Sequence, residues 1–237
     1  MSSIEVNGPK ISFKIPIFGG INVTETVILQ WIVMLFIMGL ILFMTSGLSK
    51  KKPKKRQILA EMAVKSINNM VVQNMGQRNI RYAPYIASLF TFILFGSLIS
   101  LTGLRSMTAD INVTMTLAMV TFSIITVHKF KANGLFGYFK SYTKPVAVIT
   151  PINIISEFAT PISMGFRLFG NMGGGMIISM LIIYALTIAS HAIGFSIPIL
   201  TVGIPAILSL YFDLFVSVIQ SFVFVMLTMV YIGSADE

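Results

Sequence analysis

Residues 27–48 read VILQWIVMLFIMGLILFMTSGL and contain no charged side chain. A helix of about 20 apolar residues spans the roughly 30 Å hydrocarbon core of a bilayer. The rest of the chain is similar, because 55% of the side chains are hydrophobic, 11% are charged and the mean hydropathy is +0.87. One soluble core cannot bury that much apolar surface. The sequence therefore predicts an all-α integral membrane protein, a single membrane domain over residues 1–237, with its first transmembrane helix at 27–48.

Short basic segments between the apolar runs predict how the chain is oriented. Residues 49–83 include the run KKKPKKR at 50–56 and form a predicted cytoplasmic basic loop, because lysine and arginine accumulate on the cytoplasmic side. Transmembrane helices at 84–104 and 111–128 then lead outward and back inward. The N-terminal segment 1–26 is expected to be extracytoplasmic and the C-terminus cytoplasmic. The net charge of +9 is explained by this asymmetry, so we predict no nucleic-acid partner.

The C-terminal half is too long for simple upright crossings. The runs 145–190 and 194–233 are interrupted early by prolines, the last being Pro161 and Pro205, and prolines break helices. About 28 residues follow each of these prolines, enough for about 42 Å of helix. Fitting that length into the bilayer requires a tilt of about 45°. We therefore expect three upright transmembrane helices and a C-terminal hairpin of two long, strongly tilted helices, joined by a turn at 191–194.

Arg167 is the only basic side chain after Lys144. An arginine near the bilayer centre costs about 2.5 to 3.5 kcal/mol on insertion scales, and its guanidinium cannot escape by losing a proton. The acids after Lys144 are Glu157, Asp213, Asp236 and Glu237. None of them is obliged to neutralise Arg167. Pairing within the chain is one interpretation, and the favoured one is a partner carboxylate from another chain or a passing ion.

Small and polar residues surround Arg167 on its predicted helix. Ser163, Arg167 and Asn171 are spaced by four, so that they share one face. Gly170 and Gly174 lie beside them, and their small-xxx-small spacing lets a neighbouring helix approach closely. Ordinary packing within the protein would also use such glycines. Beside a charged residue, the pattern favours a contact surface for a moving partner.

A second polar stripe is predicted on the last long helix. Asp213, Ser217 and Gln220 are spaced at i, i+4 and i+7, on one face. Counted from the turn between the two long helices, Gln220 reaches about the depth of Arg167. Asp213 lies nearer the outer turn, where a hydrated carboxylate can relay a proton or an ion, and Glu157 lies toward the cytoplasm, where it could line an exit path. For both acids, an ordinary position at the membrane interface is the alternative.

Nothing in the sequence predicts a cofactor or a metal site. The chain has no cysteine, no metal-ligand spacing around its two histidines and no nucleotide-binding loop. We therefore expect no catalysis by this chain alone.

Three stretches of the C-terminal half carry a family resemblance: residues 161–172 read PISMGFRLFGNM, residues 220–231 read QSFVFVMLTMVY and residues 151–158 read PINIISEF. They resemble the a subunit of bacterial and chloroplast-type ATP synthases, which translocate protons or sodium ions. The resemblance implies a stator subunit that offers two ion half-channels to a rotating c-subunit ring and couples ion flow to ATP synthesis. It also implies a b-subunit peripheral stalk, the remaining synthase subunits, and a multi-pass position in a bacterial plasma membrane.

The resemblance also implies roles for single residues. Arg167 matches the essential arginine that acts as gate and seal, Asn171 and Gln220 match polar residues near it, Asp213 matches the outer half-channel, Glu157 the cytoplasmic half-channel, and Ser163 and Ser217 are polar lining. The sequence departs from the family at Met176, where many members place an acid or histidine facing the Asp213 position, and at Gly173 and Gly174, where bulkier residues are usual. Asp213 is thus expected to lack its usual partner.

Two questions remain open from the sequence. A stand-alone secondary transporter with a midplane site around Arg167 is the alternative function; it should show inverted repeats, and we find none. The choice between proton and sodium cannot be read from this chain, because the ion-binding carboxylate would belong to the ring.

Overall fold

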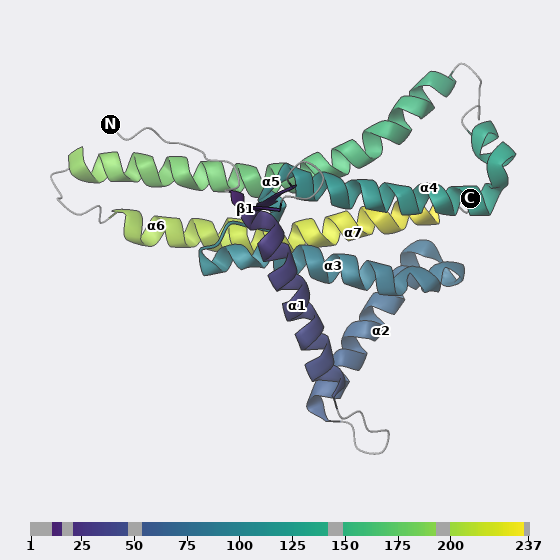
Figure 1. The fold of residues 1–237 in the computed structure, drawn as a ribbon, viewed down its shortest axis with the longest axis horizontal. Helices are drawn as coiled ribbons and strands as arrows, with labels where there is room; N and C mark the ends of the chain where they lie inside the picture. The colour runs from purple at the N-terminus through teal and green to yellow at the C-terminus, as the bar shows by residue number, and fades with distance from the viewer. Residues whose placement is uncertain (1–10, 16–20, 47–53, 142–148, 193–199, 235–237) are drawn as a thin grey trace.

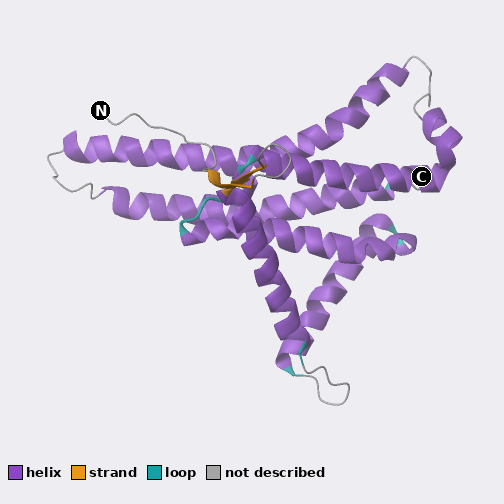
Figure 2. Cartoon of the chain, viewed as in Figure 1, coloured by secondary structure: helices purple, strands orange, loops and turns teal. Residues whose placement is uncertain are grey.

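The computed structural model describes residues 11–15, 21–46, 54–141, 149–192 and 200–234. This part of the chain is almost entirely helical (Figure 1, Figure 2). Within it, five segments are long and apolar enough to cross a membrane: Glu25–Thr45, Gln77–Thr102, Ile111–Ala132, Thr150–Ser190 and Pro205–Gly233. The predicted class of helical membrane protein is confirmed.

A small hairpin precedes the first span, so the fold is not purely helical. Strand β1 (Ile11–Ile15) pairs antiparallel with β2 (Ile21–Thr24), and Ile15 lies opposite Ile21. Both strands are rich in β-branched residues, which favour extended backbone. Helix α1 (Glu25–Thr45) begins directly after β2, and most of its apolar side chains are exposed, as expected for a lipid-facing helix.

The predicted basic loop at 49–83 is helical for most of its length. It contains helix α2 (Lys55–Met75) followed by the 3-10 helix η1 (Gln77–Tyr82). No proline or glycine interrupts 55–75, and the helix ends at Gly76, whose φ of 77° suits glycine. Helix α2 packs against α3 and α7, and its last turn is partly buried. This packing stabilises a helix that the basic residues of the segment did not indicate.

The two middle spans contact the C-terminal helices. Helix α3 (Ala83–Leu98) continues into the 3-10 helix η2 (Ile99–Thr102), and a loop with the 3-10 helix η3 (Met107–Ala109) leads to α4 (Ile111–Ser141). Helix α4 extends well beyond the predicted end at 128 and is kinked at Gly134, where φ is 68°.

Prolines do not end the two long arms. Helix α5 (Thr150–Ala192) contains Pro161, and helix α6 (Leu200–Ser209) contains Pro205. Membrane helices tolerate proline where neighbouring helices and local backbone adjustments compensate the lost hydrogen bond, and Figure 1 shows α5 changing direction along its length. The second arm continues through a π-helical segment, η5 (Leu210–Val216), into α7 (Ser217–Gly233).

The parts of the predicted hairpin at 145–148 and 193–199 lie outside the described residues. In the described part, α5 contacts α6, η5 and α7. The predicted contrast between upright and tilted helices is not evident in the packing: α4 contacts α5, α3 contacts α7, and α1 diverges from the other helices (Figure 1). The tilt against a bilayer stays a prediction.

The core lies where α2, α3, α4, α5 and α7 meet. Its largest fully buried members include Phe224, Ile86 and Ile93, with Leu168 contributed by α5. Leu168 follows Arg167 directly, so burial of one side chain directs its neighbour away from the core.

Candidate functional site

Arg167 lies on the outward face of α5, as its neighbours in sequence predict. Its side chain is exposed, and no described residue forms an ion pair or hydrogen bond with it. Ser163 and Asn171 are exposed on the same face. Among the described residues, a Cβ atom added at Gly170 or Gly174 would meet nothing within 4 Å. The guanidinium therefore lies on a face with small residues that the described part of the chain leaves uncovered.

Asn171 connects this face to α7. Its Nδ2 donates a hydrogen bond to Oε1 of Gln220 at 2.5 Å, and Gln220 is 4% exposed. The Nε2 of Gln220 is buried without a partner among the described residues. The sequence placed Gln220 near the depth of Arg167; its hydrogen bond is to Asn171, one turn further along α5.

Asp213 lines a cavity of about 590 Å³. The cavity lies between α5, the second arm and the segment around η2 and η3, and Met176 and Arg105 also border it. The Oγ of Ser100 donates a hydrogen bond to Oδ1 of Asp213 at 2.8 Å. A hydroxyl from η2 thus contacts the carboxylate, while the thioether of Met176 lines the same space.

The predicted stripe of Asp213, Ser217 and Gln220 is divided in the structure. Asp213 is half-buried at the cavity, whereas Ser217 and Gln220 are buried toward α5. The reason is the π-helical segment, whose i to i+5 hydrogen bonding changes the angle between successive side chains. The Ser217 hydroxyl donates to the main-chain oxygen of Asp213 and contacts Sδ of Met172. It therefore stabilises the π-helical segment rather than lining the cavity.

Close packing holds the π-helical segment against α5. A Cβ atom at Gly175 would lie 2.9 Å from Cδ1 and 3.4 Å from Cβ of Phe212, which directly precedes Asp213. Glycine at this position allows α5 and the π-helical segment to approach. Gly170 and Gly174 of α5 thus face open space among the described residues, whereas Gly175 makes a close contact with the π-helical segment.

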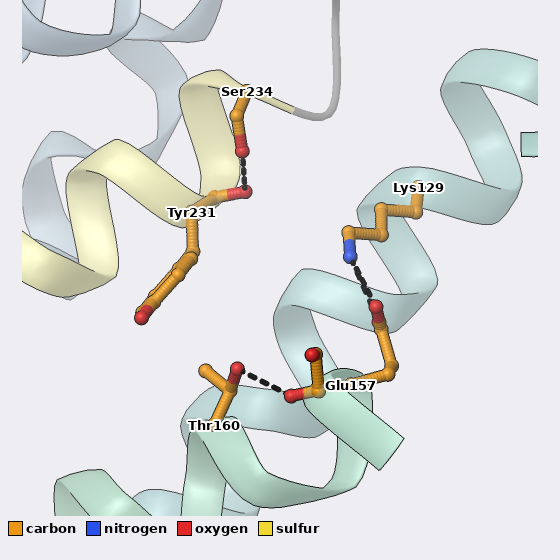
Figure 3. Close-up of polar contacts among 6 residues, drawn as sticks. Lys129, Glu157, Thr160, Tyr231 and Ser234 are labelled. Atoms are coloured by element: carbon orange, nitrogen blue, oxygen red, sulfur yellow. Dashed lines mark hydrogen bonds and ion pairs between the residues drawn. The ribbon is translucent and has the colours of Figure 1, made fainter. Parts of the chain in front are cut away.

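Glu157 lies at a second cavity, of about 330 Å³, bordered by α4, α5 and α7. Nζ of Lys129 is 2.8 Å from both carboxylate oxygens of Glu157 (Figure 3). The cavity is also lined by Asn153, Ser156, Thr160 and Tyr231.

The sequence indicated Asp213, Glu157 and Arg167. It did not indicate that Ser100 contacts Asp213 or that Lys129 contacts Glu157. Ser100 is 113 residues from Asp213, and Lys129 is 28 residues from Glu157. Lys129 lies one residue beyond the predicted span at 111–128, where a basic residue is expected for orientation alone. For Ser100 the sequence carries no pairing signal, because a serine after an apolar run is common in membrane helices.

Five described helices of membrane length, one of them carrying an exposed arginine, define a multi-pass helical membrane protein with a charge at membrane depth, and such a charge is typical of proteins that move ions. The family model described as ATP synthase A chain matches residues 27–233. The chain is 36% identical over 265 residues to "ATP synthase subunit a, sodium ion specific" of Propionigenium modestum, covering 98% of this chain and 86% of that protein. It is 34% identical over 188 residues to ATP synthase subunit a of Sulfurihydrogenibium sp., with coverages of 77% and 83%.

The chain therefore belongs to the ATP synthase A chain family, the ion-translocating subunit a of F-type ATP synthases. A third relative, subunit a 1 of Syntrophotalea carbinolica, is 36% identical over 212 residues, with coverages of 87% and 83%. Family membership implies assembly with other synthase subunits. It sets aside the alternative of a stand-alone transporter.

Proposed function

We propose that Arg167 receives the ion-carrying carboxylate of a rotating c-subunit ring. The observation that carries this proposal is the uncovered guanidinium on a face where Gly170 and Gly174 leave room for a partner helix. An arginine at membrane depth needs a counter-charge, and the described residues supply none. A carboxylate that arrives, pairs and departs with the ring meets this need without a permanent partner.

The two cavities are proposed as the offset half-channels. Glu157 precedes Arg167 by ten residues and Met176 follows it by nine, so these two lining residues lie about 15 Å and about 14 Å from the arginine along α5, on opposite sides of it. We assign Asp213 to the outer half-channel and Glu157 to the cytoplasmic one, with Asn171 and Gln220 supporting the arginine. Ser163 is exposed polar lining beside it, and Ser217 acts through the backbone of Asp213.

Arg167 then acts as gate and seal. It attracts a deprotonated ring carboxylate and releases it to be reloaded from one half-channel, and its fixed positive charge opposes direct ion passage between the cavities. The membrane potential supplies about 2.3 kcal/mol per charge per 100 mV, so a leak around the arginine would dissipate this energy without rotation.

The partners and placement follow from the same function. We propose that the chain contacts the c-ring through the outward face of α5 and is held by a b-subunit stalk in a bacterial plasma membrane. Its N-terminus is outside, its C-terminus is cytoplasmic, and α5 and the α6–α7 arm are strongly tilted. The ion is a proton or sodium; the name of the Propionigenium modestum relative makes sodium a specific candidate to test.

Replacement of Arg167 by alanine tests the proposal. In the complete synthase reconstituted into vesicles, Arg167→Ala should abolish ATP synthesis driven by an ion gradient, while ATP hydrolysis by the soluble head remains. Lys131→Gln, which removes an exposed charge elsewhere on α4, is the matched control and should retain synthesis. Coupled synthesis by the Arg167→Ala complex would overturn the proposal.

A further inference from the structure

Glu157 and Lys129 form a two-point ion pair between α5 and α4. Nζ lies 2.8 Å from Oε1 and 2.8 Å from Oε2 (Figure 3). The side chain of Lys129 is 25% exposed and that of Glu157 is 16% exposed, so the pair is partly shielded but still borders open space. One ammonium group therefore contacts both oxygens of the carboxylate.

The open space beside the pair is the cavity of about 330 Å³. Its other polar lining consists of neutral groups from α5 and α7. The titratable groups that border it are Glu157, Lys129 and Tyr231. The Oγ1 of Thr160 already donates to the main-chain oxygen of Ser156, within its own helix turn. The cavity therefore offers an entering cation one carboxylate, and that carboxylate already forms an ion pair with a lysine.

We propose that Lys129 is an internal counter-ion that competes with the translocated cation for Glu157. This inference rests on the proposed role of Glu157 in the cytoplasmic half-channel. The lysine carries one positive charge on a flexible stem, so it can withdraw when a cation binds and return when the cation leaves. Competition keeps the cation affinity of the cavity low. Ions that leave the ring are then released to the cytoplasm instead of remaining on Glu157.

Lys129→Gln in the complete reconstituted synthase tests the competition. ATP-driven uptake is measured in inverted vesicles against the cation concentration on the side that bears the soluble head, with tracer sodium at fixed pH and protons at fixed sodium. Without the lysine, the half-saturating concentration of the translocated cation should fall about twofold to fivefold, the range that a partly exposed charge pair supports. Lys129→Arg should restore the normal dependence.

Lys131→Gln is the matched control, because Lys131 is an exposed lysine two residues further along α4 with no contact to Glu157. It should leave the half-saturating concentration unchanged. The double variant Lys129→Gln/Glu157→Gln leaves no uncompensated charge, so it should assemble normally and respond to the cation like Glu157→Gln alone. The amount of assembled complex is measured for each variant.

The outcomes separate this inference from the proposed function. If Lys129→Gln lowers uptake equally at all concentrations, the pair is only a structural link between helices and the competition is wrong. If Glu157→Gln shifts the half-saturating concentration and Lys129→Gln does not, the half-channel role stands and the competition fails. If neither variant shifts it, the proposed role of Glu157 fails as well.

Discussion

The Oγ of Ser100 donates a hydrogen bond to the carboxylate of Asp213. With Met176 lining the same cavity, the Oγ of Ser100, 2.8 Å from Oδ1, is a neutral donor that holds Asp213 in one orientation. A hydrogen bond to a charged group is stronger than one between neutral groups. We therefore interpret Ser100 as a positioning residue for Asp213.

Replacing Ser100 by alanine should slow ion entry from the outer side. We expect ATP synthesis at subsaturating outer ion concentration to fall about threefold to tenfold, because about 1 kcal/mol of hydrogen bonding to Asp213 is lost. Asp213→Asn should slow synthesis as well, and Ser100→Ala should add nothing to it, because the hydroxyl acts through the carboxylate. The measurement is the synthesis rate against outer ion concentration for the single and double variants.

Thr102→Ala is the control for this comparison. Its hydroxyl donates to the main-chain oxygen of Ile99 in its own turn and has no bond to Asp213. The rate should stay at the parental value. Independent, additive losses from Ser100→Ala and Asp213→Asn would contradict the positioning role.

Among the elements, the contact between α5 and the π-helical segment is the tightest constraint near Asp213. We expect Gly175→Leu to push η5 away from α5, because even a Cβ atom at this position would approach Phe212 to 2.9 Å. Displaced together with Phe212, Asp213 should lose its bond to Ser100, and coupled synthesis should drop by about fivefold or more, as overpacking of about 1–3 kcal/mol implies. Synthesis and assembly are measured together.

Gly174→Ala is the matched control on the neighbouring position of the same helix. A Cβ atom there would meet nothing within 4 Å of this chain. If the outward face contacts a ring, a methyl group should cost less than the large side chain at Gly175. Normal synthesis by Gly175→Leu would show that the close contact is not required.

The elements also show what a single sequence can predict. The length of the charge-free runs predicted the membrane spans, because a run such as 27–48 is stable in few environments other than a bilayer. It did not predict α2, because the lysines preceding this helix indicate only which side of the membrane it occupies. The continuation of α5 through Pro161 depends on neighbouring helices, and such compensation is invisible in local pattern.

For the candidate site, the sequence predicted which residue types are present but not which side chains contact one another. A lone intramembrane arginine is conspicuous in any sequence, and helical spacing was enough to place Ser163 and Asn171 on its face. The π-helical segment changed the register of Asp213 relative to Ser217, and no residue pattern marks such a bulge.

The whole molecule exposes a wide apolar surface. Large exposed side chains include Trp31, Leu35 and Leu42 on α1, and Ile155 and Phe158 on α5. Lipid or other membrane subunits must cover this surface, because a soluble monomer rarely exposes contiguous apolar patches of such size. A molecule embedded in this way has a defined orientation, and the basic segments determine which one.

Cysteine labelling tests this orientation directly, because the chain has no cysteine of its own. A membrane-impermeant maleimide should label Ser3→Cys from the outer side of intact cells. It should label Ser66→Cys on α2 and Ser234→Cys after α7 only in inverted vesicles; both serines are exposed in the structure. Leu42→Cys, in the lipid-facing part of α1, should stay unlabelled from either side. Labelling of Ser3→Cys and Ser66→Cys from the same side would mean that α1 does not cross the membrane, and the orientation assigned to both cavities would be wrong.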